Sequence, residues 1–378
     1  MKIRTFAKLG DICDVSAGQG APQGDSNYCD NGTPFVKAGN LIELIQGKKE
    51  TEIQKVSEDV AKKHKLKKYP VGSLLFAKSG MSCMKGYVYQ LKNDSYVVSH
   101  LAIVKPKKDS SDYIEYCLRH IKPNSLVKDE AYPSISLQDI SNLEIPLPSL
   151  EEQVKIADQL SKCTQIINKH KEQLEKYDFL IKSRFIEMFG DPVQNSKGYK
   201  YKKLEELGKW ESGGTPSRKN NDYFKGSIPW YSAGELNSLY LYDSNEKITE
   251  TAIEESSAKL FRKGSLFVGM YDTAAFKMGI ATTDCSSNQA CANIFPNRDV
   301  NVIWLYYELM EMKEFFLQNR RGVRQKNLSL GMIKGFEIPY APSNLQNDFA
   351  AFVQQIDKSK FEIWLTLQNY GIIEKRVF

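Results

Sequence analysis

The sequence predicts an α+β protein in which two repeated globular domains are joined by two long helices packed as an antiparallel coiled coil. Three observations support this prediction. The chain has 378 residues of near-average globular composition, its second half repeats the landmarks of the first, and each half ends in a long helical pattern. The length exceeds that of one typical domain. We place the first domain at residues 1–148, the first helix at 149–190, the second domain at 191–342 and the second helix at 343–378.

The repeat is visible as paired segments that keep their order along the chain. TPFVKAGNL corresponds to IPWYSAGEL, Gly72 to Gly264 and Ile145 to Ile338, with offsets of 192 to 195 residues. Solenoid repeats have periods of about 20 to 50 residues. The spacing therefore indicates duplication of a whole domain.

Within each copy, short apolar runs bounded by glycine or polar clusters predict strands. These runs are SLLFA, YVYQL and VVSHLAIV in the first copy and SLFVG and CANIF in the second. Their β-branched and aromatic content is typical of strands. Residues 113–121 and 302–316 predict amphipathic helices at corresponding places. We expect one curved sheet in each domain.

The long helices are predicted from capping signals and a seven-residue apolar spacing. Ser149 and Glu152 form an S-x-x-E capping box, and Gly190 and Pro192 end the pattern about 40 residues later, which corresponds to roughly 60 Å of helix. The stripe consists of Leu160, Ile167, Leu174, Ile181 and Met188 in the first helix, and of Phe349, Ile356, Ile363 and Tyr370 in the second. Such spacing is typical of a coiled coil, and the alternative is a pair of ordinary helices belonging to two globular cores.

Composition excludes several classes of protein. Seven scattered cysteines without a C-x-x-C pair predict a reduced, cytoplasmic chain, and no apolar run approaches the length of a membrane span. No phosphate-binding loop, G-x-G-x-x-G fingerprint or H-E-x-x-H motif occurs, so we expect no catalytic, cofactor-binding or metal site. Turn formation accounts for Gly18, Gly20, Gly213 and Gly214. Asp299, Glu311 and Lys313 resemble a nuclease fragment, but a solvated helix face is the preferred interpretation.

Two basic clusters stand out against a net charge of only +6. The segment NRRGVRQKN combines guanidinium groups, which can bind phosphate or guanine, with amides that can read adenine. Other polar loops have the same makeup, although flexible turns are an equal alternative there. The DNA-binding candidates are Arg320, Arg321, Arg324, Gln325, Lys326 and Asn327, then Thr215, Ser217, Arg218, Lys219 and Asn220, then Tyr271 and Lys277, and in the first copy Gln19, Gln23, Lys78, Ser79 and Lys85. The lysine run at residues 62–68 is more typical of a solvated helix face.

The segment EIPLPSLEEQVKIADQL, followed by a long helix ending in RFIEMFGDP, resembles the specificity (S) subunits of type I restriction-modification systems. The resemblance extends over essentially the whole chain. It implies that each globular domain is a target-recognition domain reading one half of a split double-stranded DNA sequence, while the helices set the spacing and dock two methyltransferase subunits. Restriction subunits would join through that complex.

The resemblance further implies a non-catalytic subunit, with S-adenosylmethionine, ATP and Mg²⁺ on its partners. Half-sites about ten base pairs apart would suit two domains on successive turns of DNA. The second helix start departs from the family pattern because it lacks the pair Glu152 and Gln153, which weakens the transfer of family roles to Leu345, Gln346 and Asn347 but not the predicted architecture. A two-headed protein-binding scaffold and a stand-alone nuclease or methyltransferase are the alternatives.

Overall fold

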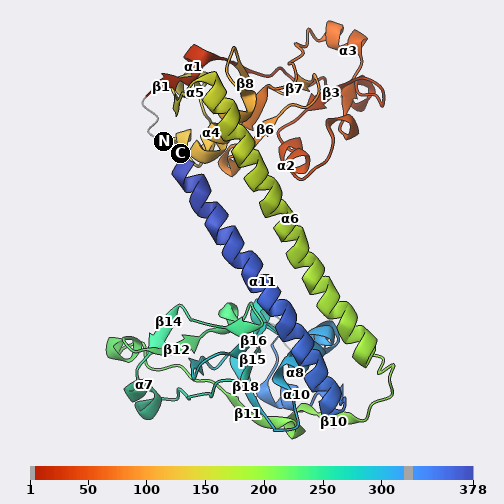
Figure 1. Ribbon diagram of the computed structural model, residues 1–378, viewed down its shortest axis with the longest axis vertical. Helices are drawn as coiled ribbons and strands as arrows, with labels where there is room; N and C mark the ends of the chain where they lie inside the picture. Colours follow the sequence, from red (N-terminus) through yellow and green to blue (C-terminus); the bar gives the residue numbers. More distant parts are fainter. Residues whose placement is uncertain (1–4, 319–326, 378) are drawn as a thin grey trace. The chain divides into compact units, whose positions relative to one another are not determined.

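The computed structural model describes residues 5–318 and 327–377, with the side chains of 369–377 left out. The chain divides into two compact units, Met1–Lys171 with Leu365–Phe378, and Glu172–Trp364 (Figure 1). The division runs through both long helices and does not test the predicted domain boundaries, which stay a prediction.

The first unit contains three sheets in its described residues. The largest has the order β2-β8-β5-β6 and is antiparallel throughout, the second has the order β4-β3-β7, and the third pairs β1 with β9. The strands are β1 (Phe6–Lys8), β2 (Cys13–Ala17), β3 (Thr33–Val36), β4 (Lys55–Val56), β5 (Leu74–Ala77), β6 (Val88–Gln90), β7 (Tyr96–Val97), β8 (Leu101–Pro106) and β9 (Glu144–Pro146). The short helices are α1 (Leu9–Ile12), α2 (Asn40–Ile45), α3 (Glu58–Lys63), α4 (Ser111–Ile121) and α5 (Leu137–Ser141).

The second unit repeats this connectivity. Its sheets have the orders β11-β18-β15-β16-β13, β14-β12-β17 and β10-β19, so the described part of this unit adds only β13 at one edge. The strands are β10 (Tyr201–Lys203), β11 (Gly208–Ser212), β12 (Ile228–Tyr231), β13 (Tyr240–Leu241), β14 (Glu246–Ile248), β15 (Leu266–Gly269), β16 (Met278–Ala281), β17 (Ser286–Ser287), β18 (Cys291–Pro296) and β19 (Glu337–Pro339). The short helices are α7 (Glu250–Glu255), α8 (Val302–Glu311), α9 (Lys313–Leu317) and α10 (Leu330–Lys334). The predicted duplication is confirmed.

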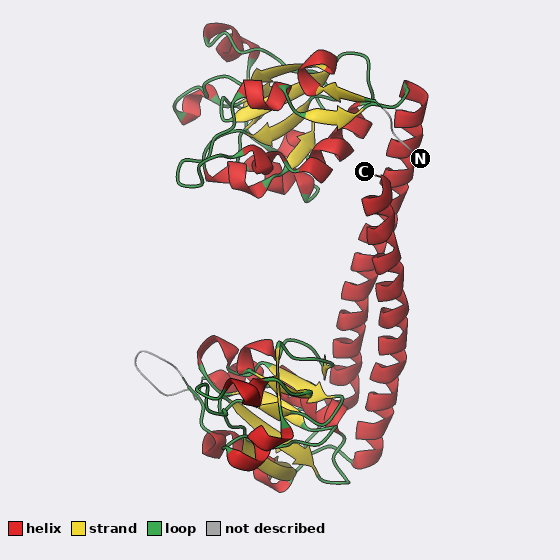
Figure 2. Cartoon of the chain, turned by 90° about the vertical axis from the view of Figure 1, so that its left-hand side faces the viewer, coloured by secondary structure: helices red, strands yellow, loops and turns green. Residues whose placement is uncertain are grey.

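The prediction of one curved sheet per domain is wrong. The run VVSHLAIV divides between β7, which pairs with β3, and β8, which pairs with β2 and β5. The chain leaves one sheet and enters another at Ser99 and His100, where Ser99 N donates to Gln19 O over 2.8 Å. The apolar runs lack alternation because every residue of β5 and of β15 is buried, as in a sheet covered on both faces (Figure 2).

The ends of the first long helix, α6 (Leu150–Phe189), agree with the capping prediction. Glu152 N donates to Ser149 Oγ over 3.4 Å, and Ser149 N donates to the Glu152 carboxylate over 3.2 Å. Gly190 then adopts a φ of +77°, a left-handed conformation that glycine tolerates at a helix end. The second long helix is α11 (Ser343–Val377), which starts directly after Pro342.

One buried glutamine ties each long helix to its own domain. Gln153 accepts from Ser110 N (3.0 Å) and donates to Asp109 (2.8 Å) and to Pro148 O (3.0 Å). At the equivalent place in the other unit, Gln346 accepts from Asn301 N (2.8 Å) and donates to Ala341 O (2.7 Å). The glutamine is therefore present at both helix starts, and the prediction that the second start lacks the Glu-Gln pair is wrong for the glutamine. Only the glutamate of the pair is lost.

Inside the second unit, α6 and α11 run antiparallel and side by side (Figures 1 and 2). Asp178 pairs with Lys360, the Arg184 guanidinium lies 5.9 Å from the Phe352 ring, and the rings of Phe185 and Phe349 are 5.4 Å apart. Residues later in α6 therefore contact residues earlier in α11. The predicted antiparallel direction is confirmed within this unit, while the full extent of a coiled coil stays a prediction.

The predicted stripe is only partly buried. Leu160, Ile181, Phe349, Ile356 and Ile363 are buried, Ile167, Leu174 and Met188 are half-buried, and the Tyr370 side chain lies outside the described residues. Leu160 belongs to the core of the first unit, and Ile181 to that of the second. The alternative interpretation, helices belonging to globular cores, therefore holds at these positions. The stripe also missed Phe185 and Phe189, which are fully buried or nearly so.

Phe185→Ala tests the importance of this packing. Removing a fully buried ring that contacts Phe349 leaves a cavity, and we expect the free energy of unfolding to fall by about 3 to 5 kcal/mol. The matched control is Phe179→Ala on the same helix, because that side chain is 73% exposed. Urea denaturation of the full chain measures both variants, and equal effects would contradict the assignment of Phe185 to the core.

The core of the second unit encloses a carboxylic acid. Glu308 on α8 is 2% exposed, and its Oε1 has no hydrogen-bond partner among the described residues. Burial raises the pKa of Glu308 to about 8, and the charge of Glu311 adds to the shift. The carboxyl is consequently protonated in the folded protein at neutral pH.

Because the folded pKa of Glu308 exceeds that of the unfolded chain, the unfolded state releases this proton first as the pH rises. Stability contributed below the ordinary glutamate pKa of 4.5 is therefore lost progressively up to about pH 8. Relative to wild type, we expect Glu308→Gln to become more stable across this range, by at most about 1.4 kcal/mol per pH unit. Denaturation at several pH values tests this, with exposed Glu314→Gln as control. Parallel stability profiles for wild type and Glu308→Gln would contradict it.

Candidate nucleic-acid interfaces

In the first unit, several predicted DNA-binding residues lie where β5 ends and β8 begins. Lys78 and Ser79 follow β5, and Lys78 N donates to His100 O over 2.9 Å. The Ser79 hydroxyl lies 2.9 Å from Nδ1 of His100. Lys85 ends the 3₁₀ turn Met81–Lys85 and is exposed. The sheet therefore brings a hydroxyl, an imidazole and lysines to one edge.

Gln19 adjoins this group, but its side chain is already engaged. Its Nε2 donates to Lys65 O over 2.7 Å, and its Oε1 accepts from Lys67 N. Gln23 is exposed, and its Nε2 donates locally to Ala21 O over 3.1 Å. Of the two glutamines, Gln23 has the amide that is freer to read a base, and a direct role for either stays a prediction.

In the second unit, Tyr271 follows β15 at the place that Ser79 holds after β5. The backbone N of Asp272 donates to Asn327 Oδ1 (3.1 Å), and Leu328 N donates to Met270 O (2.8 Å). Lys277 Nζ reaches Gly234 O at 3.4 Å. Asn327, which is 55 residues beyond Asp272, therefore lies near the same end of β15 as Tyr271 and Lys277. Arg320, Arg321, Arg324, Gln325 and Lys326 lie outside the described residues.

The remaining candidates form the loop at residues 215–220. Arg218 makes a two-pronged ion pair with Glu246 and lies 4.3 Å from the centre of the Phe224 ring. Thr215 Oγ1 bonds to Gln289, Ser217 Oγ accepts from Lys219 N (3.4 Å), and Asn220 Oδ1 accepts from Asp222 N (3.1 Å). Lys219 is exposed and has no carboxylate within 4 Å among the described residues. Most polar side chains of this loop are therefore already engaged in hydrogen bonds or ion pairs within the protein.

The glycines beside these loops are required by close backbone approach, and the expectation that turn formation accounts for them is wrong at three positions. A Cβ on Gly18 would lie 2.2 Å from Val98 O, and one on Gly213 would lie 2.3 Å from Ser287 O. For Gly214 the distance to Ser257 O would be 1.9 Å. None of the three has a positive φ. Their missing side chains let neighbouring loops pack directly on the strand.

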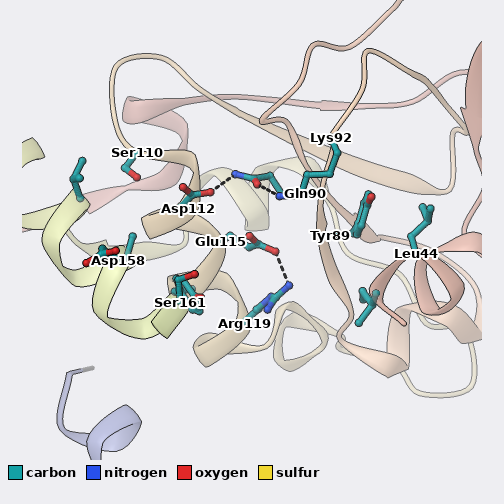
Figure 3. Close-up of a pocket in the computed structure, with 14 residues that line it drawn as sticks. Leu44, Tyr89, Gln90, Lys92, Ser110, Asp112, Glu115, Arg119, Asp158 and Ser161 are labelled. Carbon is teal, nitrogen blue, oxygen red and sulfur yellow. Dashed lines mark hydrogen bonds and ion pairs between the residues drawn. The ribbon is translucent and has the colours of Figure 1, made fainter. Parts of the chain in front are cut away.

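A concavity of about 540 Å³ lies elsewhere in the first unit, lined by α2, β6, α4 and the start of α6 (Figure 3). Several of its polar side chains are bonded to one another. Gln90 Nε2 donates to Asp112 (2.7 Å), and Arg119 pairs with Glu115 (2.6 Å). None of the predicted DNA-binding residues lines it.

The nuclease-like fragment has its carboxylates engaged with different partners. Asp299 accepts from the Tyr340 hydroxyl over 2.9 Å, whereas Glu311 pairs with Lys182 of α6 at 3.2 Å. Within the described part of the chain, no group of three or more His, Cys, Asp or Glu side chains is placed to hold a metal ion. No described helix combines the length and apolar character needed to cross a bilayer.

Comparison with known proteins explains the repeat. The family model described as the type I restriction modification DNA specificity domain matches residues 4–176 and again residues 196–369. The chain belongs to this family. The type I specificity domain is therefore present twice, in agreement with the sequence resemblance and with the two sets of sheets.

Curated relatives cover part of the chain. It is 30% identical over 186 residues to the type I restriction enzyme MjaIX specificity subunit of Methanocaldococcus jannaschii. The matched region covers 47% of this chain and 43% of the relative. It is 23% identical over 288 residues to the EcoR124I/EcoR124II specificity subunit of Escherichia coli, which covers 71% of this chain and 69% of the relative. The chain thus spans less than half the length of the first relative.

Solved structures of type I systems share the fold. The S subunit of M. genitalium superimposes with a TM-score of 0.61 at 14% identity, covering 98% of this chain and 94% of that one. A structure from a study of complex assembly in the type I restriction-modification system gives a TM-score of 0.58 at 16% identity, covering 99% and 96%. At these identities the similarity shows the fold alone.

Sequence reasoning missed the residues that connect the candidate loops of this specificity protein. His100 lies inside a predicted strand run, and Gln289 lies between two predicted strands. Their partners, Ser79 and Thr215, are 21 and 74 residues away. No local signal marks such pairs, because only the sheet order brings them together.

Gly214→Ala tests the close approach of the loops in the second unit. The added Cβ would overlap Ser257 O, so the backbone must shift, and we expect a loss of about 1 to 3 kcal/mol in the free energy of unfolding. Gly234→Ala is the control, because its nearest neighbour atom would be 3.9 Å away. Chemical denaturation measures both, and an unchanged stability for Gly214→Ala would show that the loop yields freely.

Proposed function

We propose that this chain is the sequence-specific DNA-recognition subunit of a type I restriction-modification complex. Each unit reads one half of a bipartite double-stranded DNA target. The observation that carries the proposal is that the two units, which belong to one family, have the same arrangement of sheets, while their equivalent loops carry different side chains.

The contrast is visible at matched positions. Lys78 and Ser79 after β5 correspond to Met270 and Tyr271 after β15, and Gln23 corresponds to Arg218. Reading of bases depends on which donors and acceptors a loop presents in a groove. Two different loop sets on one framework therefore favour two different half-sites, separated by a gap that neither unit reads.

The long helices are the proposed docking sites of two methyltransferase subunits, through which restriction subunits join the complex. Within the second unit, Phe179 is 73% exposed, Phe361 is 58% exposed and Trp364 is 50% exposed, and the last two rings stack 5.8 Å apart. Exposed aromatic side chains grouped on a helix are typical of surfaces that bind another protein.

In this proposal the chain itself catalyses no reaction. S-adenosylmethionine, ATP and Mg²⁺ are bound by the methylation and restriction partners. The names of the two curated relatives described above, both specificity subunits, support this division of labour. The arginine-rich segment at residues 319–326 stays a candidate for DNA contact from its sequence alone.

Domain exchange in the intact system tests the proposal. Residues 1–148 are replaced by the corresponding domain of another specificity subunit, and the methylated sequences of the host genome are determined. We expect a gapped motif in which one half changes and the other is retained, because each half is read independently. A continuous motif, or a change in both halves, would contradict it. Absence of any methylation dependent on this chain would favour the protein-binding scaffold.

A further inference from the structure

The first unit carries a strongly basic loop that contains none of the candidate DNA-binding residues. From the last two residues of α3 to the residue before Tyr69, five of seven residues are lysines, and all five are exposed. They are Lys62, Lys63, Lys65, Lys67 and Lys68. Among the described residues, none of their ammonium groups has a carboxylate within 4 Å. Residues 62–68, which comprise the end of α3 and the segment after it, are called the lysine loop below.

The lysine loop is held in place by the side chain of Gln19. The carboxamide donates to Lys65 O over 2.7 Å and accepts from Lys67 N, so it grips the loop backbone on both sides of Leu66. Lys65 has a φ of +50°, and this left-handed turn directs the loop back toward the sheet. The Tyr69 hydroxyl then donates to Ala17 O over 3.1 Å. A solvated, mobile face would need none of these bonds.

The second unit lacks both features at the matched positions. Residues 254–260 correspond to the lysine loop without any gap and contain two glutamates and one lysine. Gln19 corresponds to Gly214, and the loop carbonyl that Gln19 binds, at Lys65, corresponds to Ser257 O. In the second unit this carbonyl packs directly against Gly214. The glutamine side chain therefore spaces the loop away from the strand in the first unit alone.

Hydrogen bonds connect the lysine loop to the candidate recognition residues of the same unit. Gln19 N donates to Val97 O, and Ser99 N donates to Gln19 O, each over 2.8 Å. His100 follows, with its bonds to Lys78 N and to the Ser79 hydroxyl. The lysine loop thus lies next to the edge that presents Lys78 and Ser79.

We propose that the lysine loop binds DNA phosphates independently of sequence, and that Gln19 is a positioning residue that presents it. This inference rests on the proposed DNA-recognition function and adds an asymmetry to it. The first unit supplies an electrostatic anchor that the equivalent loop of the second unit does not. Phosphate contacts fix the register of a protein on DNA, while base contacts specify the sequence.

The test is the salt dependence of DNA binding by the full chain carrying Lys65→Gln, Lys67→Gln and Lys68→Gln. Binding to a duplex that contains the methylated motif is titrated between about 50 and 200 mM salt, because each phosphate contact contributes about 0.9 to the slope of log K against log salt. We expect the slope to fall by about two to three and the methylated motif to stay the same. An unchanged slope overturns the proposal.

The control removes three exposed lysines outside the lysine loop, by Lys108→Gln, Lys197→Gln and Lys263→Gln, so the net charge changes equally. A slope loss as large in this control as in the loop variant would mean a general charge effect and would overturn the proposal. Wild-type chain that binds the motif no better than random DNA would instead contradict the recognition function. If the lysine-loop variant lost binding to the methyltransferase subunits while the salt slope of DNA binding stayed unchanged, the lysine loop would be a protein-binding surface.

Gln19→Ala tests the positioning role. Without the carboxamide the loop is free to move, so we expect the same direction of change in slope as for the lysine variant, with the methylated motif retained. A changed half-site would show that Gln19 reads a base and would overturn this part of the proposal. Gln138→Ala, a substitution of an exposed glutamine on α5, is the matched control and leaves the slope unchanged.

Discussion

The attachment of each domain to its long helix depends on a buried glutamine at the start of that helix. Gln153 and Gln346 each accept from the backbone of the residue that caps the domain's own helix, α4 or α8, and donate to a carbonyl just before the long helix. A buried amide left without partners costs about 1 to 3 kcal/mol, so each bond constrains the direction in which the helix leaves. The recurrence of this contact in both units indicates that the helix start is part of the duplicated domain.

Apolar packing then determines which parts of α6 belong to the core of a unit. Ile156 and Leu160 near the start of α6 lie in the core of the first unit, while Phe185 and Phe189 near its end lie in the core of the second. Half-buried residues such as Ile167 and Leu174 occupy the stretch between them. The ends of α6 therefore have the character of core helices, although one seven-residue stripe runs along the whole helix.

The two units divide their residues between a shared framework and divergent loops. Apart from the additional edge strand β13, the strand order is the same in both units, and β2 pairs with β8 in the same register as β11 with β18. Two residues after β2 the first unit has Gln19, whereas two residues after β11 the second unit has Gly214. The Gln19 side chain lies between the strand end and the backbone of residues 65–67, whereas Ser257 O packs directly against Gly214. In the proposed function, two such units present different surfaces to two stretches of DNA on one kind of core.

The sequence by itself determined the duplication, the apolar strands, and both ends of α6, because these follow from local spacing, capping and composition. It predicted Gln19 as a DNA-binding candidate and explained Gly214 as a turn residue, since isolated polar and small residues carry no mark of their partners. Only the tertiary structure showed that Gln19 binds the backbone 46 to 48 residues away and that Gly214 has no room for a Cβ. Phe185, Phe189 and the fit of Gln346 likewise depended on contacts between distant segments. Such contacts arise from the packing of strands and helices far apart in the chain, which no local pattern encodes.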